Sequence, residues 1–316
     1  MKKLIFLFFN ISFYLWASSN NLGGSAFPII KLIQNPYINS LGSATVADTS
    51  SPIFILNPAA GKSYKKKLYF STTYTKWIEG IYGFSGLFNY KKYGFGIDYI
   101  NERDITTINK IGVMGNTINN YALKIYGNYQ FLFKRLALGI SGNLISNKFL
   151  DETYTDMSLS LGLQYQMTSH WSAGISLRNL GYLPHVPYSI DVGLAYSIYL
   201  KLIKMNFYTA FNLDYDNFPK LKVGFSYIYN NYLDLRIGYT HKIAQTYQIN
   251  KGLTMGIGFS VFQYRIDFTY MPISGMEDSY QLALSSRING FPIKPKKEES
   301  ETSDFVPRKR TRKIHR

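Results

Sequence analysis

Large apolar residues alternate with polar ones over most of the chain from Leu68 onward. In the stretch QYRIDFTY (263–270), for example, every second residue is large and apolar. A period of two is typical of a β-strand with one apolar face and one polar face. Nowhere does an apolar run reach the roughly 20 residues that a membrane-spanning helix needs. The pattern predicts an all-β chain and leaves open whether the apolar faces meet a protein core or lipid.

Fourteen segments carry this alternation, and nothing between them has the period of a long amphipathic helix. They are 68–75, 81–90, 93–102, 120–133, 135–148, 156–167, 170–180, 188–200, 203–214, 218–230, 232–241, 251–261, 263–271 and 279–289. We expect each of them to form a strand.

The connections between these segments alternate strictly between short and long. Short ones lie at 91–92, 134–135, 168–169, 201–202, 230–231 and 262–263, and longer ones at 76–80, 103–119, 149–155, 181–187, 215–217, 242–250 and 272–278. Outer-membrane barrels have an even strand number, short periplasmic turns and longer external loops. The order predicts a transmembrane antiparallel β-barrel of about 14 strands over residues 68–290, with both termini in the periplasm.

The polar face is rich in Ser, Gly, Asn, Thr and Gln, and it is predicted to line the lumen. A soluble barrel filled with leucine is disfavoured because side chains fill the interior at about eight strands, whereas fourteen enclose a wider space. Lumen-facing glycines such as Gly174, Gly224 and Gly256 leave room for a plug. The candidate lumen-lining charges either border a substrate path or pair with one another or with the plug; they are Arg178, Arg236, Arg265, Asp267 and Arg287.

The two ends of the chain are predicted to lie outside the barrel. Residues 1–17 have the basic start and short apolar run of a secretory signal peptide. Residues 291–316 are rich in proline and charge and are predicted to be a disordered periplasmic tail. The chain contains no cysteine, which excludes a lipid-anchored cysteine, a disulfide or a thiolate metal site.

Composition supports a membrane location without proving it. The chain has 28 Tyr and 22 Phe, and tyrosine suits a membrane interface because its ring is apolar and its hydroxyl is polar. The alternative is a general compositional bias toward Lys, Asn, Ile, Tyr and Phe. The net charge of +16 is spread thinly outside the tail and comes with no nucleic-acid-binding motif, so we expect no nucleic-acid partner.

Residues 18–67 lack sustained alternation and are predicted to form an N-terminal plug inside the lumen. The segment contains the apolar runs FPIIKLI and PIFIL, which are poorly suited to remain solvated. Within it, Gly42, Ala44, Ala47 and Asp48, followed by Asn57-Pro58-Ala59-Ala60, resemble the amino-terminal segment of FadL-like outer-membrane proteins. The closer resemblance is to the PorV/PorQ family and a related uncharacterised family. Further similar motifs follow in the same order: NLG at 179–181, LRIGY at 235–239 and GLTMGIGFSV at 252–261.

The resemblance implies a fourteen-stranded barrel with an N-terminal hatch in which Asn57, Pro58, Ala59 and Ala60 lie near the lumen wall. The alternative for these four residues is a simple end to an apolar run, since proline removes a backbone donor and biases the preceding residue toward extended geometry.

Three functions remain open from the sequence. The first is a FadL-like channel for hydrophobic small molecules, and the second, from the PorV-like resemblance, is a barrel that binds secreted cargo proteins in type IX secretion. The third is an outer-membrane hydrolase, for which no catalytic constellation is found. The four histidines lie apart without metal spacing, so neither a metal nor a cofactor is predicted. An apolar interior pocket would favour transport, whereas exposed apolar external loops would favour a protein partner, and the loops 179–187 and 271–279 carry apolar residues. The expected partner in every case is outer-membrane lipid, together with hydrophobic small molecules or secreted cargo proteins.

Overall fold

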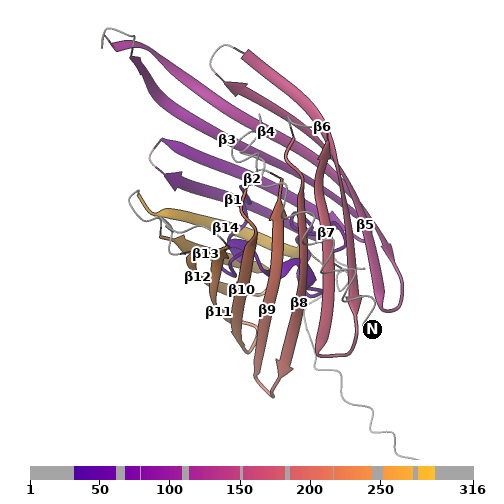
Figure 1. The fold of residues 1–316 in the computed structure, drawn as a ribbon. Helices are drawn as coiled ribbons and strands as arrows, with labels where there is room; N and C mark the ends of the chain where they lie inside the picture. Colours follow the sequence, from indigo (N-terminus) through magenta and orange to yellow (C-terminus); the bar gives the residue numbers. More distant parts are fainter. Residues whose placement is uncertain are drawn as a thin grey trace, which may run out of the picture.

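The fold is a single closed antiparallel β-barrel of fourteen strands (Figure 1). The computed structural model describes residues 32–61, 68–78, 80–108, 114–149, 152–181, 186–215, 217–243, 252–272 and 277–288. Each strand pairs with its neighbours in chain order, and β1 closes the barrel on β14 through the register Leu68↔Ile288 to Lys76↔Tyr280. The strands are β1 (Leu68–Ile78), β2 (Ile81–Tyr90), β3 (Tyr93–Ile108), β4 (Met114–Leu132), β5 (Leu136–Phe149), β6 (Glu152–Gln166), β7 (Trp171–Gly181), β8 (Ser189–Tyr199), β9 (Ile203–Asp214), β10 (Lys220–Tyr229), β11 (Leu233–Lys242), β12 (Leu253–Val261), β13 (Tyr264–Met271) and β14 (Ser279–Ile288).

All fourteen predicted segments are strands, and the six short connections lie together at one end of the barrel, here called the short-turn end. Asparagine suits such a turn because it tolerates positive φ, and Asn230 and Asn231 have φ of 48° and 57°. Among the described residues, no helix has the length and apolarity to cross a membrane.

Three of the seven connections at the opposite end are shorter than predicted, because β1, β3, β4, β5 and β6 continue into them. β3 and β4 extend to Ile108 and from Met114, so most of the predicted loop 103–119 is a protruding hairpin, and only two residues separate β5 from β6. A strand that extends past the apolar belt needs ladder hydrogen bonds but no apolar face. Its sequence therefore loses the alternation from which a strand is recognised.

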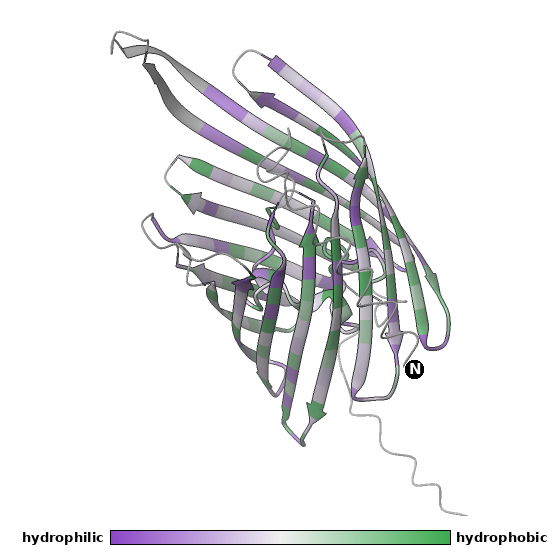
Figure 2. Cartoon of the chain, in the orientation of Figure 1, coloured by the Kyte–Doolittle hydropathy of each residue, from purple (hydrophilic) through white to green (hydrophobic). Residues whose placement is uncertain are grey.

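Hydrophobic and hydrophilic residues alternate along many of the strands (Figure 2), and the two faces of the wall have opposite chemistry. Large apolar side chains point outward and are exposed, including Phe84, Met157, Leu235 and Phe259. The intervening positions point inward and are buried, and they are mostly Ser, Thr, Asn and Gln. This arrangement confirms the predicted direction of the apolar face and gives the outside of the barrel a surface suited to lipid.

Residues 32–61, here called the plug segment, lie inside the barrel (Figure 1). The segment contains one short helix, α2 (Pro36–Asn39), and one 3₁₀ turn, η3 (Thr45–Ala47). Asn35 caps α2 by accepting a hydrogen bond from the Ile38 N–H, and Pro36 stands at the first helical position, where no N–H is needed. α2 packs against β12, β13 and β14, whereas η3 packs against β7, β8 and β9.

The hydrophobic core therefore lies in the lumen and is built mainly from the plug segment. Ile38, Leu41, Val46, Phe54 and Leu56 are buried there, against inward-facing side chains of the wall that include Tyr126, Tyr208 and Ala210. The predicted signal peptide (1–17), the tail (291–316) and the remaining parts of the predicted plug (18–31 and 62–67) lie outside the described residues.

Candidate functional site

Glycines on the inner wall allow the plug segment to approach the strands at backbone distance. On nine strands, an ideal β-carbon built on a wall glycine would stand closer than 3 Å to an atom of the plug segment. The pairs include Gly174 with Val46, Gly224 with Leu41 and Gly256 with Ser40, and the nine glycines are Gly83, Gly94, Gly139, Gly162, Gly174, Gly193, Gly224, Gly238 and Gly256. The space predicted at Gly174, Gly224 and Gly256 is occupied by the plug segment.

Polar side chains of the wall satisfy the backbone of the plug segment. Thr269 Oγ1 donates to the Pro36 carbonyl at 2.6 Å, and Thr240 Oγ1 donates to the Gly42 carbonyl at 2.9 Å. Gln164 Nε2 donates to the carbonyls of both Val46 and Asp48, and Ser172 Oγ donates to that of Ala47. Asn89, Gln130 and Gln281 donate in the same way to Pro52, Ala60 and Ile33. Because buried carbonyls need partners, these side chains replace the ladder that the segment lacks.

The four predicted hatch residues form a β-turn pressed against β5 and β6. Asn57 accepts hydrogen bonds from Ala60 N at its carbonyl and from Ala59 N at its Oδ1. Proline follows asparagine, which is the residue order that such a turn favours. Asn57 Nδ2 donates to Val46 O at 2.8 Å and to Leu163 O, on β6, at 3.2 Å. Asn57 thus connects two parts of the plug segment to the wall.

Three of the predicted lumenal charges form one cluster near the short-turn end, here called the Arg265 cluster (Arg236 and Asp234 on β11, Arg265 and Asp267 on β13). Arg265 Nε donates to Asp267 at 2.7 Å, and its Nη2 donates to Asp234 at 2.6 Å. Arg236 Nη1 lies 2.7 Å from Asp267 Oδ1. The cluster is nearly closed to solvent, so each charge depends on its neighbours for compensation.

Tyr37, from α2, covers this cluster from the lumen side. Its ring centroid lies 5.3 Å from Arg236 Cζ and 5.8 Å from Arg265 Cζ, within the range of cation–π attraction. The phenol donates to Asp48 Oδ2 at 2.7 Å and lies 3.2 Å from the hydroxyl of Tyr208. Burial, reinforced by the charge of Asp48, raises the pKa of Tyr37 well above its usual value, so the phenol keeps the proton that it donates.

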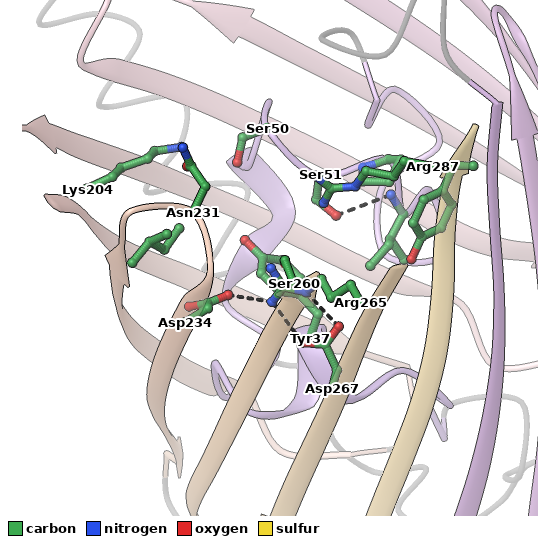
Figure 3. A pocket seen from close by; sticks show the side chains of 14 residues that line it. Tyr37, Ser50, Ser51, Lys204, Asn231, Asp234, Ser260, Arg265, Asp267 and Arg287 are labelled. Carbon is green, nitrogen blue, oxygen red and sulfur yellow. Dashed lines mark hydrogen bonds and ion pairs between the residues drawn. The ribbon is translucent and has the colours of Figure 1, made fainter. Parts of the chain in front are cut away.

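A cavity of about 140 Å³ lies between the Arg265 cluster and the plug segment (Figure 3). The plug segment contributes Tyr37 and residues 50–53. The wall contributes three members of the cluster, Asp234, Arg265 and Asp267, together with Lys204, Asn231, Ser260 and Arg287. Figure 3 shows Lys204 and Arg287 on opposite sides of this space, with Arg265 and Asp267 beneath it. Arg287 is thus close to three of the predicted lumenal charges.

Arg178 stands apart from the other predicted charges, toward the opposite end of the barrel. Its Nη2 lies 2.7 Å from Asp191 Oδ2, and Lys222 Nζ lies 2.9 Å from the other oxygen of the same carboxylate. Nearby, Lys220 pairs with Asp214 at 2.7 Å. The plug segment is therefore flanked by an ion-pair network on each side.

Sequence reasoning missed the partners Asp191 and Tyr37 and gave Asp234 no site role. Asp191 and Asp234 occupy inward positions of their strands, so alternation alone identifies their direction. Tyr37 carries no comparable signal, because nothing in PYINS indicates which wall residues it meets. No group of three His, Asp or Glu side chains capable of holding a metal occurs within the described ranges.

Comparison with solved structures agrees with the fold. The chain is similar to the CymD monoaromatic hydrocarbon channel, with a TM-score of 0.53 and 11% identity over 80% of this chain and 96% of that one. It is also similar to the toluene transporter TodX of P. putida, with a TM-score of 0.46 and 12% identity over 80% of this chain and 98% of that one. No protein-family model matches the sequence, and no curated protein sequence does.

The fold is a closed fourteen-stranded antiparallel β-barrel, and the CymD channel shares it. The lumen of this barrel holds residues 32–61.

Proposed function

We propose that the protein is an outer-membrane channel that admits hydrophobic small molecules from the outside and is closed by its plug segment. The observation that carries this proposal is an apolar patch on the inner wall, where most of the buried residues are polar. The short-turn end faces the periplasm in this proposal, as the turn lengths indicate.

The apolar patch lies on β3, β4 and β5, toward the end away from the short turns. Ile100, Ala122 and Ile145 point inward and are buried. Together with Leu32 of the plug segment and the charged residues Asp98 and Lys124, they line a cavity of about 10 Å³. Leu32 is 37% exposed although it belongs to the segment inside the barrel. Because Ile100, Ala122 and Ile145 are buried, an apolar molecule reaches them only when the plug segment moves. Burial of its apolar area against them then favours binding by about 25 cal/mol per Å².

The likeness to CymD supports this choice among the functions considered. CymD is described as a monoaromatic hydrocarbon channel, and it shares the barrel fold. A molecule of that class is apolar and compact, which matches a patch made of Ile, Ala and Leu side chains. The ligand class proposed here is therefore a small hydrocarbon or another uncharged aromatic compound.

A disulfide between the plug segment and the wall tests whether the plug must move. The β-carbon of Leu41 lies 3.1 Å from the ideal β-carbon position on Gly224. A disulfide spans roughly 3.5–4.5 Å between β-carbons, so the bridge forms with a small outward shift of the plug segment from β10. The chain has no cysteine of its own, so Leu41→Cys with Gly224→Cys introduces a single possible bridge. Uptake of labelled toluene would be measured in a diderm host that produces the barrel, before and after reduction.

We expect uptake to be low in the oxidised double variant and to recover on reduction, whereas each single cysteine variant behaves the same in both conditions. Ile145→Asp should lower toluene uptake without changing the assembly of the barrel. If production of the unmodified barrel does not raise uptake at all, the channel function is wrong. If uptake persists with the bridge closed, the plug does not control the route.

The cargo-binding role in type IX secretion is a second proposal, supported only by the sequence resemblance. Purification from native outer membrane distinguishes the two, because a cargo-binding barrel would retain a stoichiometric protein partner, whereas a channel would not.

A further inference from the structure

The cavity at the Arg265 cluster is rich in hydrogen-bond donors that the protein itself does not use. Arg265 donates from Nε to Asp267 and from Nη2 to both Asp234 and Asp267. Its Nη1 makes no hydrogen bond to any described residue. Lys204 Nζ has no ion pair in the described part of the chain and lies 5.4 Å from the ring centroid of Tyr199. The side chains of Asn231 and Ser260 also line the cavity and bond to no described group.

The acceptors of the same site are largely occupied. Both oxygens of Asp267 receive hydrogen bonds from Arg265, and Asp234 Oδ2 receives another. Asp234 Oδ1 has no partner among the described residues, but it is buried. The cavity therefore offers free hydrogen-bond donors, whereas most of its acceptors already have partners. Such a site suits a ligand that carries mainly hydrogen-bond acceptors.

The charge of the site has the matching sign. Four cationic side chains surround the cavity or stand directly behind it, namely Lys204, Arg236, Arg265 and Arg287. They face the carboxylates of Asp234 and Asp267, and that of Asp48 behind Tyr37 and Ser50. The difference, four minus three, is +1. Partial burial strengthens the attraction of this excess for an anion, because the effective dielectric constant is lower than in water.

We propose that this cavity binds a compact oxyanion, either inorganic phosphate or the phosphate of a small soluble phosphomonoester. Its 140 Å³ is close to the volume of about 150 Å³ that holds a benzene-sized molecule, so the five non-hydrogen atoms of phosphate fit. Arginine and lysine bind phosphate oxygens through short, charge-assisted hydrogen bonds. The amide of Asn231 and the hydroxyl of Ser260 supply neutral donors in the same space.

The bound anion would join the plug segment to the wall. Tyr37 and residues 50–53 form one side of the cavity, whereas Lys204, Asn231 and Ser260 belong to β9, the β10–β11 turn and β12. Because the ligand contacts both sides, its binding free energy adds to the association of the plug with the barrel. This site is separate from the apolar patch, so it stands or falls independently of hydrocarbon transport.

Isothermal titration of the refolded full-length protein with inorganic phosphate tests the proposal. The main variant is Lys204→Gln, and the matched control is Lys201→Gln, which removes the same charge from the turn three positions away and does not line the cavity. We expect saturable binding to the unmodified protein, weakened about 10- to 100-fold by Lys204→Gln and unchanged by Lys201→Gln. Ser260→Ala, which removes a neutral donor, should weaken it by about 2- to 10-fold.

Competing anions and a folding check complete the design. Sulfate should compete with phosphate because it has the same shape and acceptor set, whereas chloride at equal ionic strength should not. Heat-modifiable migration on gels establishes that each variant is a closed barrel. Absence of saturable phosphate binding, equal weakening by Lys201→Gln, or equal competition by chloride would each overturn the site.

Discussion

Gly139 of β5 and Pro58 of the plug segment lie so close together that no side chain fits between them. A β-carbon placed on Gly139 would overlap the carbonyl group of Pro58, whereas one on Gly142, three residues along the same strand, meets nothing within 4 Å. Gly142 points outward and Gly139 points into the lumen. One strand thus offers a glycine that the plug requires and a glycine that it does not.

Replacement of Gly139 by alanine should therefore loosen the plug while the barrel remains closed. The added methyl group must displace the backbone of the turn that holds Asn57 and Pro58, and overpacking of this kind costs typically 1–3 kcal/mol. We expect more frequent channel openings in planar bilayers for Gly139→Ala. Gly142→Ala serves as the control and should match the unmodified protein; equal behaviour of the two variants would mean that this contact does not hold the plug.

Asn57 and Asn128 give a second matched pair, since both are buried asparagines and only one has partners. Asn57 makes three side-chain hydrogen bonds, whereas neither amide atom of Asn128 bonds to a described residue. Asn57→Leu leaves the carbonyls of Val46 and Leu163 without this donor, which costs about 1–3 kcal/mol. Asn128→Leu should be neutral or stabilising.

For both variants, the urea concentration at which half of the plug segments are released is measured. Release is detected as a rise in the conductance of the barrel in vesicles. A lower midpoint for Asn57→Leu alone is expected. A similar loss for Asn128→Leu would show that general polarity of the lumen, and not the hydrogen bonds of Asn57, keeps the segment in place.

On the outer face of a strand, the cost of introducing a charge should depend on how deep the position lies in the bilayer. Ile237 lies in the middle of β11 and is 43% exposed on the apolar face, whereas Leu233 begins the same strand on the same face. Ile237→Arg should cost about 2–4 kcal/mol of unfolding free energy in a bilayer, and Leu233→Arg about 0–1 kcal/mol. Denaturant unfolding in vesicles measures both, and equal costs would contradict a lipid-facing midstrand position.

Removal of the whole plug segment tests its role as a barrier. Deletion of residues 32–61 should leave a barrel that still migrates anomalously before heating, because strand pairing β1 to β14 involves none of these residues. Its conductance in planar bilayers should rise markedly, since the hydrophobic core of the lumen is gone. Unchanged conductance in a correctly folded deletion variant would exclude the plug as the barrier.

The barrel could be predicted from the sequence because lipid and lumen impose opposite requirements on alternate residues. Stretches such as 157–165 on β6 satisfy both requirements. The number of strands, their order and the direction of their apolar faces can therefore be predicted from such stretches. The ends of β3 and β4 that meet at the connection 109–113 could not be predicted as strands. Outside the apolar belt both faces of a strand meet water, so the sequence there need not alternate. The glycines on the inner face predicted room for a plug, but they did not identify the plug residue that lies against each glycine.

The candidate site was predictable only on its barrel side. Arg236, Arg265 and Asp267 could be placed in the lumen from alternation alone. Their approach to Tyr37 depends on how an irregular segment crosses the lumen, and no local periodicity encodes that path. The cavity at the Arg265 cluster arises from both parts together, so reasoning from single segments could not find it.

The way in which wall side chains satisfy the plug carbonyls has a consequence for the order of folding. α2 has four residues and η3 has three, too few to persist before their surroundings exist, because helix nucleation is unfavourable. The donors that replace internal hydrogen bonds come from β2, β4, β6, β7, β11, β13 and β14, which are assembled only when the barrel closes. We therefore expect the segment that is synthesised before the barrel strands to become ordered only as they assemble around it.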